Sequence, residues 1–153
     1  MNKELNVFLE AQLKAAADLV LEVDQVSPMW ALVDAKKRVT LIVSPWHSDE
    51  EKEAAIKAIR FKMEIDGTVM YAAISEAWMA KVPLDDPDKL MKIRPSERND
   101  REEVIIVTVN DHLDTVVGML AIERGEDGKI TGTKRLPLED GQSFGGRMTE
   151  LLR

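Results

Sequence analysis

The chain has no cysteine among its 153 residues, only two histidines, and aromatic side chains at 5% of the total. Without thiols, a structural disulfide, a thiolate metal site and a cysteine nucleophile are all excluded. Two histidines are too few for a zinc site built from histidine alone. We therefore expect no cofactor and no bound metal, and we assign no catalytic residue.

Basic residues are in deficit: 21 Lys and Arg stand against 28 Asp and Glu, which gives a net charge of −7. That charge repels nucleic acid and anionic membrane surfaces at long range, so it disfavours both as partners. No apolar run approaches the roughly 20 residues that a membrane-spanning helix needs. The N-terminal residues show no signal-peptide pattern, so the expected setting is the cytoplasm.

The sequence motifs of the common enzyme classes are missing as well. There is no phosphate-binding Gly-x-x-x-x-Gly-Lys loop, no Gly-x-Ser-x-Gly nucleophile turn and no His-Glu-x-x-His zinc helix. Their absence lowers the odds of those classes without excluding an unusual enzyme. Whether the chain is an enzyme stays open at this point.

What is present is the patterning of a globular domain with two helices. Hydrophobic residues make up 44% of the chain, enough for one packed core at this length. Helical spacing of apolar residues predicts a first helix over 5–23, ended by Ser27-Pro28. A capping box from Ser48 to Glu51 begins a second helix, and Gly67 ends it.

Short β-prone runs predict the strands. Two of them flank a polar turn at 34–38, and a long alternating strand follows the second helix. The last third is predicted to form three strands joined by turns at 110–114 and 125–128, and the second turn contains Asp-Gly, a strong hairpin signal. The predicted strands cover residues 29–33, 39–43, 68–82, 102–109, 115–123 and 129–136.

We therefore predict one α+β domain over residues 1–153. Its antiparallel sheet has about five to six strands, and the element order is α-β-β-α-β-β-β-β. Both helices are expected on one face of the sheet. A long polar loop at 83–100 and a short C-terminal tail at 138–153 complete the chain, and the loop is long enough to be a functional candidate.

Three arginines gather at the end of this loop: Arg94, Arg98 and Arg101. A guanidinium group binds carboxylate or phosphate through two parallel hydrogen bonds, so the segment could hold a small anionic ligand or an acidic partner. Acids in the same segment, such as Glu97 and Asp100, could instead neutralise the arginines. Both interpretations stay open.

Glu76 and Trp78 lie on one face of the long predicted strand, and a carboxylate on a half-buried strand needs a partner. One hypothesis pairs Glu76 with an arginine of residues 94–101 and makes Trp78 the wall of the resulting pocket. In the alternative, this face is open to water and Trp78 packs at the edge. The candidate contact residues are Glu76, Trp78, Arg94, Ser96, Arg98 and Arg101.

The two histidines and the other two tryptophans are weaker candidates for a functional site than the arginines, Glu76 and Trp78. His47 and His112 each have acids nearby, as a general base or metal ligand would. Exposed turns beside helix-cap and hairpin acids explain both histidines more simply. Trp30 and Trp46 flank the first predicted hairpin, and we expect them to pack in the core.

Three segments resemble a pattern in uncharacterised small proteins of bacteria and their phages. They are Ser75-Glu76-Ala77-Trp78, Arg94-Pro95-Ser96-Glu97-Arg98 and Arg101-Glu102-Glu103-Val104, and the resemblance covers residues 28–136. That group has no established activity. The resemblance implies a prokaryotic cytoplasmic setting and nothing catalytic.

The leading hypothesis is a non-enzymatic binding or accessory protein. Its partner would be another protein or a second copy in a homodimer, contacted through a sheet face or an edge strand. The alternative is a small enzyme acting on a nucleotide or phosphoester, with the arginines clamping the anion and Glu76 or His47 moving a proton. Such an enzyme would need these groups around one concave pocket.

Overall fold

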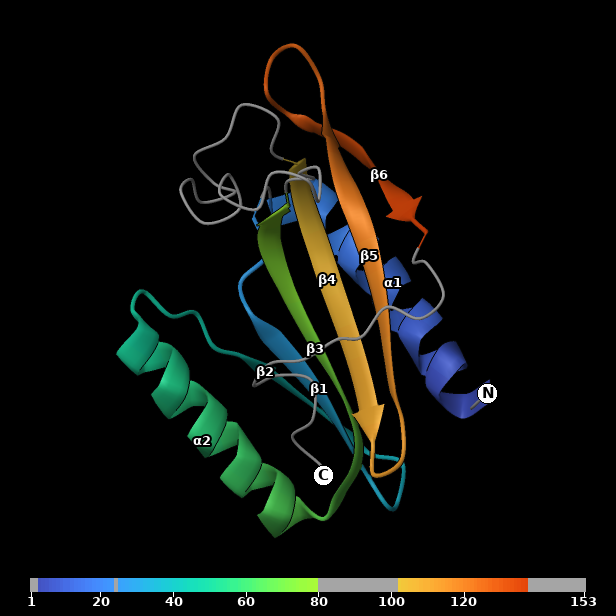
Figure 1. The fold of residues 1–153 in the computed structure, drawn as a ribbon, viewed down its shortest axis with the longest axis vertical. Helices are drawn as coiled ribbons and strands as arrows, with labels where there is room; N and C mark the ends of the chain where they lie inside the picture. Colours follow the sequence, from blue (N-terminus) through green and yellow to red (C-terminus); the bar gives the residue numbers. More distant parts are fainter. Residues whose placement is uncertain (1–2, 24, 80–101, 138–153) are drawn as a thin grey trace, which may run out of the picture.

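The structure is a computed structural model that describes residues 3–23, 25–79 and 102–137. Within these ranges two helices and six strands follow the order α-β-β-α-β-β-β-β, so the predicted α+β class and element order are confirmed (Figure 1). The predicted loop at 83–100, the tail at 138–153 and the end of the long strand lie outside the described residues. The elements are α1 (Lys3–Val23), β1 (Met29–Asp34), β2 (Val39–Val43), α2 (Asp49–Asp66), β3 (Thr68–Met79), β4 (Glu102–Asp111), β5 (Thr115–Arg124) and β6 (Ile130–Leu136).

The strands form one antiparallel sheet in the order β2-β1-β3-β4-β5-β6. The centre is the β3–β4 pair, which runs from Met70 opposite Asp111 to Met79 opposite Glu102. Helix α2 connects β2 to β3, and β1 lies between these two strands. Among the described strands, β2 and β6 are therefore the two edges of the sheet.

Helix α1 covers one face of the sheet over β3, β4, β5 and β6. It buries a stripe at helical spacing, and the apolar residues of the central strands meet that stripe. At Gly118 on β5 the helix lies close to the strand, since a Cβ atom there would be 2.7 Å from Cδ1 of Leu13. Val23 fits the helical spacing that predicts this helix over 5–23, but it is the last residue of α1 and is 47% exposed. The buried stripe is Leu5, Leu9, Leu13, Ala16 and Val20.

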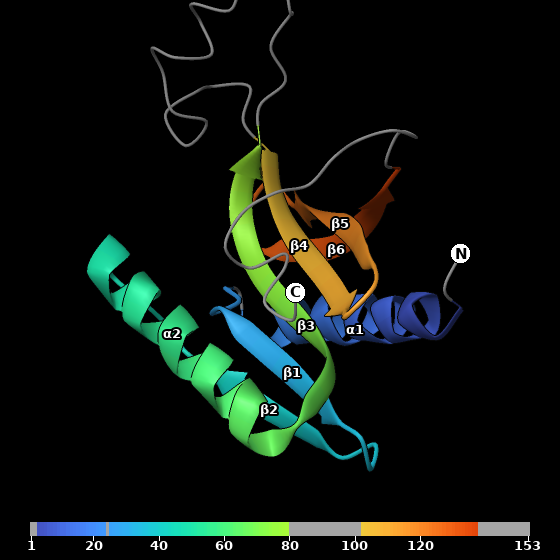
Figure 2. The same ribbon diagram turned by 60° about the horizontal axis from the view of Figure 1, so that its bottom comes forward.

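Helix α2 covers the opposite face, so the prediction of both helices on one face is wrong (Figure 2). Successive side chains of a strand point to opposite faces. On β3, Ala72 packs in the α1 cluster while its neighbours Tyr71 and Ala73 pack in the α2 cluster. Both faces of β3 are apolar, so the alternation along the strand does not indicate which helix covers which face.

The ends of α2 follow their sequence signals closely. Ser48 Oγ accepts a hydrogen bond of 3.1 Å from the Glu51 amide, as the capping box predicts. The Glu51 carboxylate accepts a hydrogen bond of 2.6 Å from the His47 amide. The capping box predicts the Ser48 amide as the donor, one residue further along the chain. Gly67 ends the helix at φ +66°, and its N–H donates to the Met63 carbonyl.

The β1–β2 turn is held by one carboxylate. Asp34 Oδ1 accepts from the amides of Lys36 and Arg38, both at 2.9 Å, and Oδ2 accepts from Arg38 Nε at 2.8 Å. The Arg38 amide, more than any other neighbour, holds the pKa of Asp34 below its ordinary value of 3.8. Lys37 adopts φ +63° at the turn. The β2 strand that leaves this turn is thus set in a fixed register.

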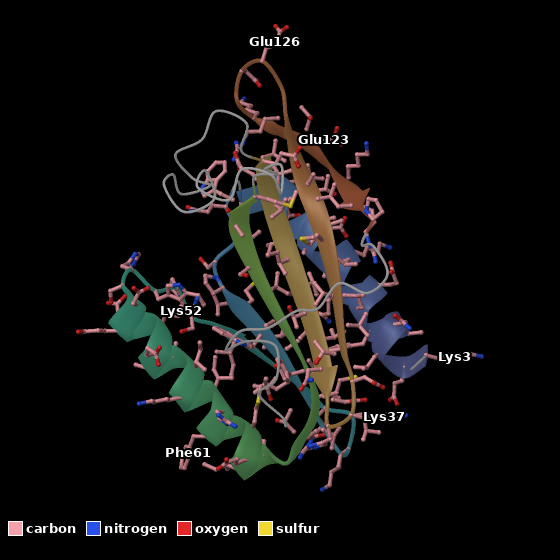
Figure 3. All side chains as sticks on the ribbon, in the orientation of Figure 1. Lys3, Lys37, Lys52, Phe61, Glu123 and Glu126 are labelled. Carbon is pink, nitrogen blue, oxygen red and sulfur yellow. The ribbon has the colours of Figure 1, made fainter. Side chains whose placement is uncertain are left out.

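Trp30 and Trp46 pack as the sequence predicts. Trp30 is fully buried in the α2 cluster, and Trp46 packs against that cluster with its ring centroid 5.7 Å from that of Trp30. Lys52 on α2 places its ammonium 5.5 Å from the Trp46 centroid, near the start of the helix (Figure 3). Neither described helix is long and apolar enough to cross a membrane.

Candidate functional site

Glu76 and Trp78 lie on the α1 face of β3, near the end of the strand. Glu76 is opposite Ile105 of β4 and Trp78 is opposite Glu103. Helix α1 has already ended here, so this end of the face is not covered by its side chains. The other predicted contact residues are Arg94, Ser96, Arg98 and Arg101, and they lie outside the described residues together with the hypothetical Glu76–arginine pair.

The Glu76 carboxylate accepts a hydrogen bond from the backbone amide of Val26. Val26 is almost fully buried, at 3% exposure, in the connection between α1 and β1. A buried amide outside a helix or ladder needs an acceptor, and Glu76 provides it. The carboxylate on an apolar strand face therefore fastens the α1–β1 connection to β3, a role that neither sequence interpretation included.

Beside Trp78 an arginine is held by an acid on the neighbouring strand. Arg124, at the end of β5, donates from Nε and Nη2 to the two carboxylate oxygens of Glu103 at 2.9 and 3.0 Å. Its Nη1 donates to the Gly128 carbonyl at 2.6 Å, so the β5–β6 turn fixes the same guanidinium. This bidentate pair is partly buried, with side-chain exposures of 32% for Arg124 and 24% for Glu103.

These side chains surround a hollow of about 340 Å³ at the end of the sheet. A second hollow of about 530 Å³ shares Trp78, Glu103 and Arg124, and it is also lined by Glu102. Since Glu102 and Glu103 are adjacent and point to opposite faces, the second hollow wraps around the end of the sheet. The smaller hollow is lined by Gln25, Glu76, Ala77, Trp78, Glu103 and Arg124.

The three charged side chains of the smaller hollow, Glu76, Glu103 and Arg124, are already engaged with the protein. Arg124 directs Nε and both Nη atoms to Glu103 and Gly128, and Glu76 accepts from Val26. Neither histidine lines the hollow, and both are exposed. Among residues 3–23, 25–79 and 102–137, no group of three or more His, Cys, Asp or Glu side chains is placed to hold a metal ion. These side chains are therefore suited to contact a bound molecule and to hold it in one orientation.

Arg124 and Glu103 were not among the predicted site residues. The predicted strand ends at 123, one residue before Arg124, and Glu103 has its partner 21 residues away. Only the β4–β5 register brings the two together. The position of Arg124 directly before the Gly125–Gly128 turn was the signal in the sequence that could have placed it at a strand end.

No protein-family model, no curated protein and no solved structure matches the chain. The resemblance of its three short segments to bacterial and phage proteins stays a prediction. What the site does is therefore inferred from its own side chains.

Proposed function

We propose that the chain is a non-enzymatic binding module of a bacterial or phage cytoplasm, and that it holds a segment of a protein partner at the end of the sheet. The observation that carries this proposal is Trp78. Its side chain is 41% exposed at the mouth of a hollow that contains a preformed Arg124–Glu103 pair. Tryptophan and arginine are the residue types that dominate binding energy at protein interfaces.

The side chains of the hollow need little further ordering when a partner binds. Glu103 and the Gly128 carbonyl already fix the Arg124 guanidinium, so its loss of side-chain freedom accompanies folding and not binding. An indole offers a large apolar surface with a hydrogen-bond donor at one edge. The hollow therefore fits a peptide segment with an apolar side chain, and the net charge of −7 favours a basic partner.

The alternative, an enzyme that clamps an anion, depends on arginines 94, 98 and 101, which lie outside the described residues. In the hollow, Arg124 is bound to Glu103 by two parallel hydrogen bonds from Nε and Nη2. An anion would have to displace a carboxylate that already satisfies the guanidinium geometry. This competition favours the binding module over the anion-clamping enzyme.

The experiment is to select binders from a displayed peptide library on the native chain and to measure their affinity for variants by calorimetry. We expect Trp78→Ala to weaken the selected peptides at least about tenfold, since truncating an interface tryptophan costs about 2 kcal/mol or more. The matched control is Phe61→Ala, because Phe61 is 65% exposed on the outer side of α2, away from the sheet (Figure 3). It should leave binding unchanged.

Two outcomes would contradict the proposal. Selected peptides could bind native chain and Trp78→Ala alike while circular dichroism shows both folded. Alternatively, a panel of nucleotides and phosphosugars could raise the unfolding midpoint of the native chain, as a ligand bound only to the folded state must. The second result would support the enzyme.

A further inference from the structure

The two edges of the sheet are built differently. Edge strand β6 contains Gly132, Lys134 and Arg135, and its register with β5 shifts at Glu123 and Arg124. Charged side chains and bulges are devices that keep an edge strand from pairing with another chain. Edge strand β2 has the sequence Val-Thr-Leu-Ile-Val, with no charge, glycine or proline, and its register with β1 has no shift.

The outward backbone groups of β2 can be identified from two hydrogen bonds at its ends. The Asp34 amide donates to the Arg38 carbonyl, and the Ser44 amide donates to the Pro28 carbonyl. Because antiparallel pairs alternate in their hydrogen bonding, Thr40 and Ile42 direct their backbone groups to β1. The N–H and C=O groups of the alternate residues, Val39, Leu41 and Val43, therefore point to the open edge.

The same three residues expose their side chains. Val39 is 53% exposed, Leu41 68% and Val43 59%. They lie on the α1 side of the sheet, since Leu41 is opposite Ala31 of the α1 cluster, but α1 packs over β3 to β6. The strand thus combines unpaired backbone groups with an apolar row, the combination that strand addition uses.

We propose that a second copy of this chain pairs antiparallel with β2 about a two-fold axis at Leu41, which joins the two sheets into one. The sequence of the strand is nearly symmetric about this point. The pairing sets Leu41 opposite Leu41, Val39 opposite Val43 and Thr40 opposite Ile42, so apolar residues meet and no like charges oppose each other.

Charge outside the strand favours the same arrangement. The turn before β2 carries the exposed Lys36 and Lys37, and the chain after β2 leads to α2, which begins with Asp49 and Glu50. In an antiparallel pair the basic turn of one copy lies toward the acidic helix start of the other. Because a five-residue strand is a small contact, we expect a reversible monomer–dimer equilibrium and not an obligate dimer. This inference is independent of the Trp78 hollow, which lies on β3, β4 and β5.

The experiment is sedimentation velocity across the micromolar range, together with a cross-link. The chain has no cysteine, so Leu41→Cys introduces a single thiol. Residues in a hydrogen-bonded antiparallel pair have Cα atoms about 5.5 Å apart, within the span of a disulfide. We expect Leu41→Cys to oxidise to a covalent dimer, whereas Leu113→Cys, at a leucine 77% exposed in the β4–β5 turn, stays monomeric under the same conditions.

A second variant tests the two-fold axis without a thiol. Leu41→Lys places two ammonium groups opposite each other, and we expect the dimer dissociation constant to rise at least about tenfold. Leu113→Lys is the matched control and should leave the dissociation constant unchanged. In the native chain, hydrogen exchange at the amides of Val39, Leu41 and Val43 should slow as concentration rises, while Thr40 and Ile42 stay protected throughout.

A native chain that sediments as a monomer at every concentration would overturn the proposal. Equal cross-linking at residues 41 and 113 would do the same. If a monomer instead bound an added β-strand peptide with protection at Val39, Leu41 and Val43, the edge would be a site for a different protein, and the self-pairing proposed here would be wrong.

Discussion

At the scale of single residues, the Glu76–Val26 contact shows a charged side chain that stabilises the fold. The sequence pattern, a carboxylate on an apolar strand face, instead indicates a ligand site at this position. Val26 follows α1 at the point where the chain turns back to begin β1, and its amide is buried. A lost partner would leave that amide unsatisfied, which costs more than the hydrogen bond itself contributes. Glu76 is thus a structural residue at the rim of the candidate site.

We expect Glu76→Ala to lower the free energy of unfolding by about 1–3 kcal/mol, because the Val26 amide loses its acceptor. Glu76→Gln keeps a side-chain carbonyl and should lose less. Urea denaturation gives both values, and hydrogen exchange at the Val26 amide reports the contact directly. Glu123→Ala, an exposed glutamate of β5 (Figure 3), is the control and should change stability by no more than about 0.5 kcal/mol. Equal stability of Glu76→Ala and the native chain would show that the contact is not stabilising.

At the scale of elements, the spacing between α1 and the sheet depends on Gly118. The terminal methyl groups of Leu13 occupy the place where a side chain at residue 118 would begin, and Leu9 also comes within 3.3 Å of it. Protein cores are packed densely enough that an added methyl group forces neighbours to move. Gly118 therefore lets the helix pack close to β5.

Gly118→Ala is expected to cost about 1–3 kcal/mol of stability by overpacking against Leu13. A smaller residue at position 13 should make room, so in a double variant with Leu13→Ala the two changes should cost less than the sum of the single ones. Gly132→Ala, where nothing lies within 4 Å of the added carbon, should be neutral or stabilising. Thermal and chemical denaturation of the four variants measures these differences. If the stability costs of Leu13→Ala and Gly118→Ala simply added in the double variant, α1 would be shifting away from β5 to accommodate the new methyl group.

The elements were predictable from the sequence because their signals are local. The Ser48 cap, the Gly67 helix end and the Asp127-Gly128 turn each act within a few residues, and the structure has all three. The faces of the sheet were not predictable in the same way. Tyr71 and Ala73 are as apolar as Ala72 and Ile74, so β3 offered two buried faces and no criterion for assigning the helices.

The candidate site was predictable in part, for the same reason. Glu76 and Trp78 stand out within a single strand because a charge and a large ring follow the apolar residues Met70, Ala72 and Ile74 on the same face. The Arg124–Glu103 pair and the Val26 contact join segments that are 21 and 50 residues apart. Such contacts require the register of β4 with β5 and the return of the chain after α1, and composition and spacing report neither of them.

At the scale of the whole molecule, one sheet supports two separate apolar clusters. The α1 cluster and the α2 cluster lie on opposite faces and share strands β1 and β3. If either helix detached, the strands beneath it would expose one face to water while the other stayed packed. Because the shared strands are hydrogen-bonded in one register, we expect the clusters to form and unfold together.

A variant in one cluster should therefore shift signals from the other. Leu9→Ala in the α1 cluster is expected to cost about 2–5 kcal/mol. Trp78 lies on the α1 face, so the experiment uses a Trp78→Phe background, in which the fluorescence comes from Trp30 and Trp46 of the α2 cluster. That fluorescence should move to lower denaturant by the same amount as far-ultraviolet circular dichroism. A dichroism midpoint that shifts alone would mean that the two faces unfold independently.

The contrast between the two edge strands also limits how far the molecule can assemble. Chains that pair through both edges form open fibres, and uncharged runs like that of β2 are the segments at which such growth begins. Here one edge is bare and the other carries Lys134 and Arg135, with Arg135 bound to Glu10 at 2.8 Å. Once two copies pair through β2, only charged edges remain at the ends of the joined sheet. The same strand that makes a lone copy prone to aggregate would then make the pair resistant to it.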